Sequence, residues 1–110
     1  MVELINGFGG VLNQIMESQE VWFVYIVRCS DGSLYTGITK DVEGRLKRHN
    51  AGTASRYTRS RLPVTVEYHE EQPSHSMALK RELAIKALSR QMKEELLRSG
   101  QDGRQESSSK

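Results

Sequence analysis

The clearest pattern in the chain is an apolar run at residues 21–27, whose sequence VWFVYIV has no alternating polar positions. β-Branched and aromatic residues in a short run of this kind predict a β-strand that is covered on both faces. Asp31 and Gly32 follow and provide the left-handed backbone position of a hairpin turn. We predict the returning strand at 34–38, where Gly37 marks a bulge or a close backbone approach.

A helix is predicted next, from Val42 to about Asn50. Asp41 can cap its first turn, because a short polar side chain there accepts a hydrogen bond from the free amides of the helix start. Gly52 can end the helix. A basic loop follows and extends to Pro63.

The alternating residues at 64–68 predict a third strand. Ser74 or Ser76 can then cap a long helix that runs through Leu88, and Ser89 can cap a last helix to about Arg98. The order of elements is therefore β-β-α-β-α-α. It predicts one α/β domain in which helices flank a three-stranded, mostly antiparallel sheet.

The two ends of the chain differ from this middle part. Residues 1–20 have no sustained apolar period and are interrupted by glycine and asparagine, so we expect an extension that is poorly ordered. Residues 99–110 contain no apolar residue, and we expect a disordered tail there. The domain itself is predicted at 21–98.

Composition limits the class of protein. With 110 residues, of which 36% are hydrophobic, the chain can build one modest core. No apolar run approaches the roughly 20 residues that span a bilayer, and the first twenty residues hold no Lys or Arg, which argues against a secretory signal. The single Cys29 can form no internal disulfide and, with three scattered histidines, no zinc site. We expect a small cytoplasmic monomer that does not bind membranes.

Charge is unevenly distributed along the chain. The net charge is +2, but residues 21–98 hold 14 basic and 9 acidic side chains, and 45–61 hold six cations and no acid. Such a cluster attracts an anion such as a nucleic-acid backbone, although a solvated basic helix and loop is the ordinary alternative. Arginines outnumber lysines there, which favours phosphate contact. The expected nucleic-acid contacts in this cluster are Lys47, Arg48, Arg56, Tyr57, Arg59 and Arg61.

Four polar or aromatic residues of the first half of the domain are candidates for chemistry. Tyr25 and Tyr35 lie on strands joined by a tight turn and are therefore close in space, although the sequence leaves open whether they share a face. Aromatic packing at a sheet surface is the ordinary alternative. Arg45 and His49 are four residues apart on the first helix and project from one face, next to its apolar stripe. Two exposed polar residues are the ordinary alternative for this pair.

Glu82 is the fifth candidate, because its helical neighbours include Ala78, Leu79 and Ile85. A carboxylate among apolar positions is partly desolvated unless another group compensates its charge. The ordinary partner is Lys86, four residues later, in an ion pair worth about 0.3–0.5 kcal/mol on an exposed helix. The functional alternative is a magnesium ligand, since Mg²⁺ keeps several waters and needs only one or two carboxylates.

These residues resemble the paired signature of the GIY-YIG nucleases. The triplet VYI at 24–26 precedes the triplet YTG at 35–37, and Arg45, His49 and Glu82 follow in the family's order. The resemblance covers residues 21–98 and is strongest to the small standalone bacterial members of the YhbQ and YazA type. It implies a divalent-metal-dependent endonuclease that hydrolyses DNA phosphodiester bonds, with DNA favoured over RNA, in DNA repair or recombination.

The resemblance also implies a role for each of the five residues. Tyr35 would be the general base or would orient the attacking water, with Tyr25 as its hydrogen-bond partner. Arg45 would contact the scissile phosphate, His49 would assist proton transfer, and Glu82 would hold a single Mg²⁺ or Mn²⁺. Tyrosine is a poor base at neutral pH because its usual pKa is about 10, so nearby cations, including His49, would have to favour the phenolate.

The sequence departs from the family pattern in three places. The first triplet is VYI rather than GIY, and the second is YTG rather than YIG. Many members, such as the incision domain of the excision-repair protein UvrC, carry an asparagine beyond the metal-binding glutamate, but residues 90–98 contain none. That substrate-positioning role is therefore unfilled or passes to Lys86, Arg90 or Lys93, and we add Lys86 to the expected nucleic-acid contacts.

Two other functions compete with the nuclease. A non-catalytic nucleic-acid-binding module would use the basic surface of 45–61 alone, and its binding would fall steeply with salt. A protein-interaction module would use the same surface for an acidic partner. The five candidate residues argue against the latter, because a protein-docking surface has no need of them.

Overall fold

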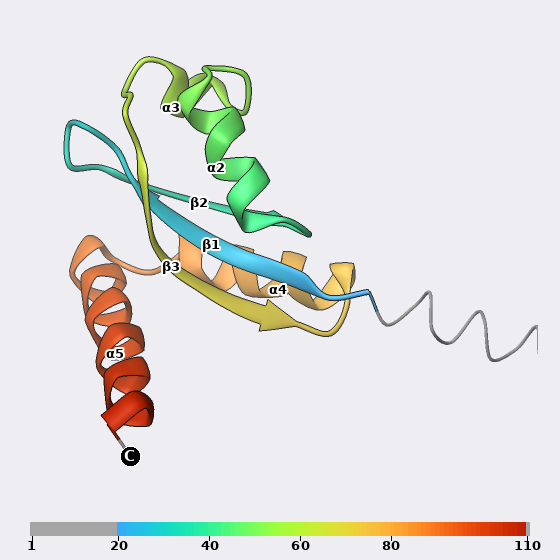
Figure 1. The fold of residues 1–110 in the computed structure, drawn as a ribbon, viewed down its shortest axis with the longest axis vertical. Coiled ribbons are helices and arrows are strands. Elements are labelled where there is room, and N and C mark those ends of the chain that lie inside the picture. The colour runs from blue at the N-terminus through green and yellow to red at the C-terminus, as the bar shows by residue number, and fades with distance from the viewer. Residues whose placement is uncertain (1–19, 110) are drawn as a thin grey trace, which may run out of the picture.

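The structure of the protein, a computed structural model, describes residues 20–109. Its centre is a sheet of three strands, β1 (Trp22–Arg28), β2 (Leu34–Thr39) and β3 (Thr65–Gln72), in the order β2-β1-β3. Both neighbouring pairs are antiparallel, which confirms the predicted sheet (Figure 1). The expected N-terminal extension falls almost entirely on residues 1–19, which lie outside the described part of the chain.

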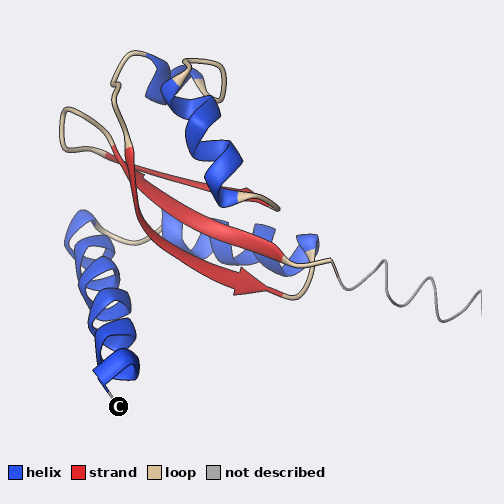
Figure 2. Ribbon diagram, in the orientation of Figure 1, coloured by secondary structure: helices blue, strands red, loops and turns tan. Residues whose placement is uncertain are grey.

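Helices cover both faces of the sheet (Figure 2). One face carries α2 (Val42–Asn50) and the short α3 (Arg56–Arg59), and the other carries α4 (His75–Lys86) and α5 (Arg90–Ser109). The central strand is therefore enclosed, and residues 24–27 are all buried, as the apolar run predicts. No helix within residues 20–109 is both long and apolar enough to cross a bilayer.

The two faces of β1 build two separate hydrophobic clusters. Val24 and Ile26 pack against the layer of α4 and α5, because alternate side chains of a strand point to opposite faces. Tyr25, Val27 and, just beyond the strand, Cys29 pack on the other side. Tyr25 thus faces the layer that contains α2.

The helices α2 and α4 begin at capping residues that the sequence predicts. The Asp41 carboxylate accepts a hydrogen bond from the Gly44 amide at 3.0 Å, and Gly52 follows α2 with a φ of +80°. Ser74, rather than Ser76, caps α4 by accepting from the Met77 amide at 3.1 Å. Each cap satisfies one of the amides that a helix start leaves without an internal partner.

Several elements differ from the prediction, and α4 ends at Lys86 instead of running through Leu88. The expected loop at 51–63 contains α3, whose first turn is capped by the Ser55 hydroxyl accepting from the Thr58 amide at 3.2 Å. Strand β3 continues past residue 68 to Gln72, because its polar second half still pairs with the beginning of β1. Backbone pairing requires no apolar side chains, so the alternation in the sequence underestimates its length.

The last helix is also longer than predicted. Its first turn is capped as expected, since the Ser89 hydroxyl accepts from the Met92 amide at 3.1 Å, but the helix ends at Ser109 instead of near Arg98. Residues 99–109, expected as a disordered tail, are therefore helical in the structure. The Tyr68 ring lies against Gly100, where a Cβ would be 2.6 Å from the ring, so contact with β3 continues beyond the predicted end.

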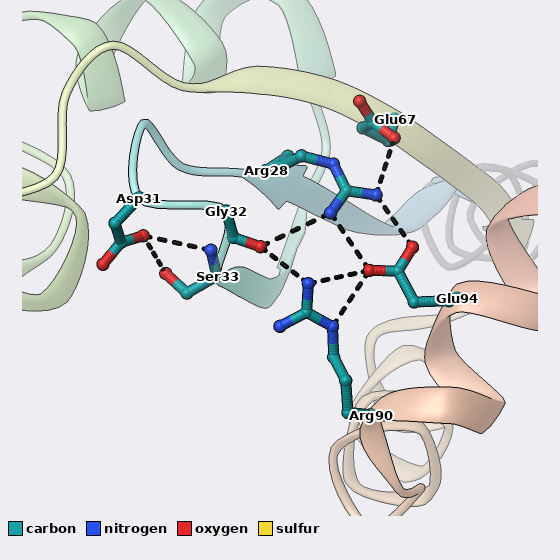
Figure 3. A network of polar contacts seen from close by, with 7 residues as sticks. All are labelled: Arg28, Asp31, Gly32, Ser33, Glu67, Arg90 and Glu94. Carbon is teal, nitrogen blue, oxygen red and sulfur yellow. Dashed lines mark hydrogen bonds and ion pairs between the residues drawn. The ribbon is translucent and has the colours of Figure 1, made fainter.

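A polar network ties α5 to the sheet (Figure 3). The Arg28 guanidinium on β1 donates two hydrogen bonds to Glu94, at 2.9 and 3.0 Å, and one to Glu67 on β3 at 3.2 Å. Arg90 donates to Glu94 and to the carbonyl of Gly32 in the hairpin turn, both at 2.9 Å. Hydrogen bonds from Arg28, with a smaller contribution from Arg90, lower the pKa of Glu94 to about 2.

We predict that Glu94→Gln destabilises the fold. Removing the charge should lower the melting temperature by about 4–8 °C, which corresponds to about 1 kcal/mol in a domain of this size. Because the folded pKa of about 2 lies below the usual 4.5, the difference from wild type is full above about pH 4.5 and disappears as pH falls toward 2. Calorimetry against the exposed neighbour variant Glu95→Gln measures both effects, and equal melting temperatures for the two variants at pH 7 would contradict the prediction.

Candidate active site

The site begins with a close approach between two strands. Tyr25 of β1 is paired directly with Gly37 of β2. A Cβ on Gly37 would lie 2.6 Å from the Tyr25 hydroxyl oxygen, which is too close for any side chain larger than hydrogen. The absence of a side chain at Gly37 therefore lets the Tyr25 ring lie over β2, the edge strand, and confirms the predicted close approach.

The Tyr25 hydroxyl contacts His49, the last-turn histidine of α2. Its oxygen is 2.9 Å from His49 Nε2, and the two residues are only 3% and 1% exposed. The other ring nitrogen, Nδ1, is 2.8 Å from the Thr58 hydroxyl of α3. His49 is therefore a buried residue that joins the sheet to both helices of this layer, and the alternative of an exposed polar residue is wrong.

The contacts of Thr58 indicate which atom donates and which accepts in each of these hydrogen bonds. The Thr58 hydroxyl donates to the Ser55 carbonyl at 3.4 Å, so its oxygen is free to accept a hydrogen bond from the Nδ1–H group of His49. Nε2 then carries no proton and accepts from the Tyr25 hydroxyl. The result is a continuous chain of donors from Tyr25 through His49 and Thr58 to the backbone of α3.

Burial keeps both partners of the central bond neutral. It lowers the pKa of His49, and the positive charge of Arg45 lowers it further. Burial also raises the pKa of Tyr25, as do Tyr35 and Glu82, while Arg45 acts in the opposite direction. At neutral pH the site therefore contains a neutral imidazole, which corrects the expectation that His49 provides a positive charge.

Tyr35 lies on the same side of the sheet but is more open. Its ring meets the His49 ring edge to face at 5.3 Å, which resolves the question of whether the two tyrosines share a face. It also stacks with Tyr57 of α3 at 6.1 Å. Tyr35 lines a surface hollow of about 260 Å³ together with Leu34, Thr36, Tyr57, Lys86 and Lys93. Of the two phenols, Tyr35 is therefore the one that a substrate can reach.

Arg45 projects from α2 into a second hollow, of about 210 Å³, which it lines with Thr39, Asp41, Gly44 and Arg48. No carboxylate among residues 20–100 forms an ion pair with it. Its charge acts on both Tyr25 and His49. Arg45 is thus a partly buried cation between the buried pair and the surface.

Glu82 reaches the site from α4. Its side chain is 15% exposed and forms the expected ion pair with Lys86, at 3.2 Å. Its negative charge is the smallest of the four influences on the pKa of Tyr25, so the carboxylate lies within electrostatic range of that hydroxyl. Among the side chains of residues 20–100, no group of three His, Cys, Asp or Glu could form a metal cage. One shielded carboxylate fits a magnesium ion that keeps most of its waters and takes other oxygens from a substrate phosphate.

The remaining expected contacts surround this centre. Lys47, Arg48, Arg56 and Arg59 are exposed on α2 and α3. Arg61 lies 3.9 Å from the centre of the Tyr57 ring and forms an ion pair with Asp31 at 3.1 Å, so part of its charge is already compensated. These five residues and Tyr57 all belong to the α2–α3 segment and the turn that follows it.

Thr58 also belongs to the site, although the sequence pattern did not single it out. It is a fully buried residue of α3 and contacts His49 directly. The signal was the capping pattern at 55–58, in which Ser55 precedes Thr58 by three residues. A helix predicted to start in this segment would have indicated that Thr58 is buried in the protein instead of lying in a solvated loop.

Residues 21–95 match the family model of the GIY-YIG catalytic domain. A UPF0213 protein of Staphylococcus aureus is 53% identical over 76 residues, which cover 69% of this chain and 93% of the relative. A UPF0213 protein of Streptococcus sanguinis is 52% identical over 71 residues, which cover 64% of this chain and 82% of the relative. A solution NMR structure of a protein from E. faecalis is 38% identical, covers 74% of this chain and 88% of its own, and has a TM-score of 0.52. The chain belongs to the GIY-YIG family.

We predict that Gly37→Ala disrupts the buried pair. The added methyl group must displace Tyr25, so the protein should lose about 1–3 kcal/mol of stability and its near-UV circular dichroism should change. The matched control is Gly32→Ala, where a Cβ meets no atom within 4 Å but the φ of +87° penalises alanine. The control should lose stability with an unchanged near-UV spectrum. An unchanged spectrum for Gly37→Ala would contradict the close approach.

Proposed function

We propose that the protein is a divalent-metal-dependent endonuclease that hydrolyses DNA phosphodiester bonds. The observation that carries the proposal is the set of groups around the Tyr25 hydroxyl. His49 is hydrogen-bonded to it, and Tyr35, Arg45 and Glu82 act on it electrostatically. These residues come from β1, β2, α2 and α4, so the fold gathers polar and aromatic groups from four elements around one hydroxyl. DNA repair or recombination is the setting that the family resemblance implies.

Tyr35 is the proposed base for the attacking water. It lines the open hollow, whereas Tyr25 is buried and engaged with His49. When Tyr35 takes a proton from the attacking water, its own hydroxyl proton would pass to the oxygen of the neighbouring Tyr25. The Tyr25 proton would then pass to Nε2 of the neutral His49, to which it is already hydrogen-bonded. A positioned base and proton acceptor contribute about 10²–10⁴-fold to such reactions.

Arg45 and Glu82 supply the two charges that the reaction requires. Arg45 has no ion-pair partner among the described residues and can bind a non-bridging oxygen of the scissile phosphate. Glu82 would hold the divalent ion, which when bound supplies positive charge at the leaving 3′-oxygen. Water attacks phosphorus as its proton passes to Tyr35, the P–O3′ bond breaks, and the leaving 3′-oxygen takes a proton from solvent, so that the products carry a 5′-phosphate and a 3′-hydroxyl.

One observation favours the second candidate, a non-catalytic nucleic-acid-binding module. Lys86 already compensates the Glu82 carboxylate, so a metal ion would have to displace or share this partner. Such a module would bind through the exposed cations of α2 and α3 and would need neither tyrosine. Cleavage assays separate the two candidates directly.

We predict that Tyr35→Phe lowers plasmid cleavage by about 10²–10⁴-fold while the melting temperature stays near that of the wild type, because only the hydroxyl is lost. Glu82→Gln should lose cleavage in Mg²⁺ and in Mn²⁺. The matched controls are Tyr68→Phe, on the opposite face of the sheet, and Glu95→Gln on α5, which should cleave normally.

Two results would contradict this proposal. Near-normal cleavage by Tyr35→Phe would remove Tyr35 from the role of base. Salt-dependent DNA binding by the wild type without cleavage in any divalent metal would favour the non-catalytic module.

A further inference from the structure

We propose that Lys93 forms an anion-binding subsite, next to the reacting centre, that holds a phosphate of the substrate strand adjoining the scissile one. The inference rests on the proposed function for the identity of the strand. The subsite is the hollow of about 260 Å³ that Lys93 lines with Tyr35, Tyr57 and Lys86.

Lys93 is a half-buried cation that has no partner among residues 20–100. No ion pair or hydrogen bond joins its side chain to any of those residues. Its helix provides no acid at the positions three and four residues away, which are Ser89, Arg90, Leu96 and Leu97. The following residue, Glu94, binds Arg28 and Arg90 instead.

The other cations near this hollow are already compensated. Lys86 forms an ion pair with Glu82 at 3.2 Å. Arg90 is held by Glu94 and the Gly32 carbonyl, as Figure 3 shows, and does not line the hollow. Lys93 is therefore the cation in this hollow whose charge remains to be neutralised, and a partly desolvated ammonium without a counter-charge favours a bound anion.

The walls of the hollow identify the class of anion. Tyr35 and Tyr57 form an aromatic side that suits a sugar or a base, and the two lysines suit a phosphate between them. Tyr35 belongs to both the hollow and the proposed reacting centre, so a phosphate at Lys93 lies on the strand next to the bond that is cut. A nucleic-acid strand provides both parts of this ligand.

Binding of a fluorescent DNA duplex without divalent metal, between 50 and 200 mM salt, tests the subsite. We compare wild type, Lys93→Gln, Lys93→Arg and Lys80→Gln, an exposed lysine on α4 that is a matched control. Lys93→Gln should weaken binding and reduce the slope of log K against log salt by about 0.9, the value for one phosphate contact on B-DNA. Lys93→Arg should restore the slope, and Lys80→Gln should leave it unchanged.

Each outcome separates the subsite from catalysis. Equal slopes for Lys93→Gln and Lys80→Gln overturn the subsite, even if the wild type cleaves DNA. A reduced slope for Lys93→Gln supports it, even if no variant cleaves, in which case the proposed nuclease activity fails instead. With an active enzyme, Lys93→Gln should raise KM several-fold and leave kcat nearly unchanged.

Discussion

The hydrogen bond between Tyr25 and His49 is the contact on which the rest of the site depends. It crosses from the central strand to α2 inside a region that excludes water, with 2.9 Å between the hydroxyl oxygen and Nε2. Buried polar groups of this kind are costly unless each is satisfied, and here Thr58 satisfies the remaining nitrogen. Gly37 makes the geometry possible because it leaves room for the tyrosine ring. A single polar connection thus explains a glycine, a buried threonine and the placement of α3.

The charged groups of the site surround a buried pair that is itself neutral. With Tyr25 protonated and His49 uncharged, the nearby charges are those of Arg45 and the Glu82–Lys86 pair. In a partly desolvated site, each of these acts more strongly than it would in water. The positive charges lie in two hollows that flank the buried pair, one lined by Arg45 and the other by Lys86 and Lys93. This arrangement suits a chain of phosphates better than an isolated anion.

Much of the fold could be predicted from the sequence, because the signals were local. The apolar run of β1, the hairpin turn and the caps at Asp41, Ser74 and Ser89 each depend on neighbouring residues. The burial of His49 and the role of Thr58 could not be predicted, since both depend on contacts across the fold. Arg90 was a candidate for substrate contact, but tertiary contacts with Glu94 and Gly32 place it elsewhere. The resemblance named five site residues, and the structure adds that Tyr25 and His49 form a buried pair and that Lys86 compensates the charge of Glu82.

The most direct test of this account is the ¹⁵N NMR spectrum of the His49 imidazole in the wild-type protein as pH is varied. The account predicts a neutral ring with the proton on Nδ1 and an unprotonated Nε2, and a pKa below the usual value of about 6.5. A ring that titrates near 6.5, or one that carries its proton on Nε2, would contradict the buried Tyr25–His49 pair as the organising contact of the site.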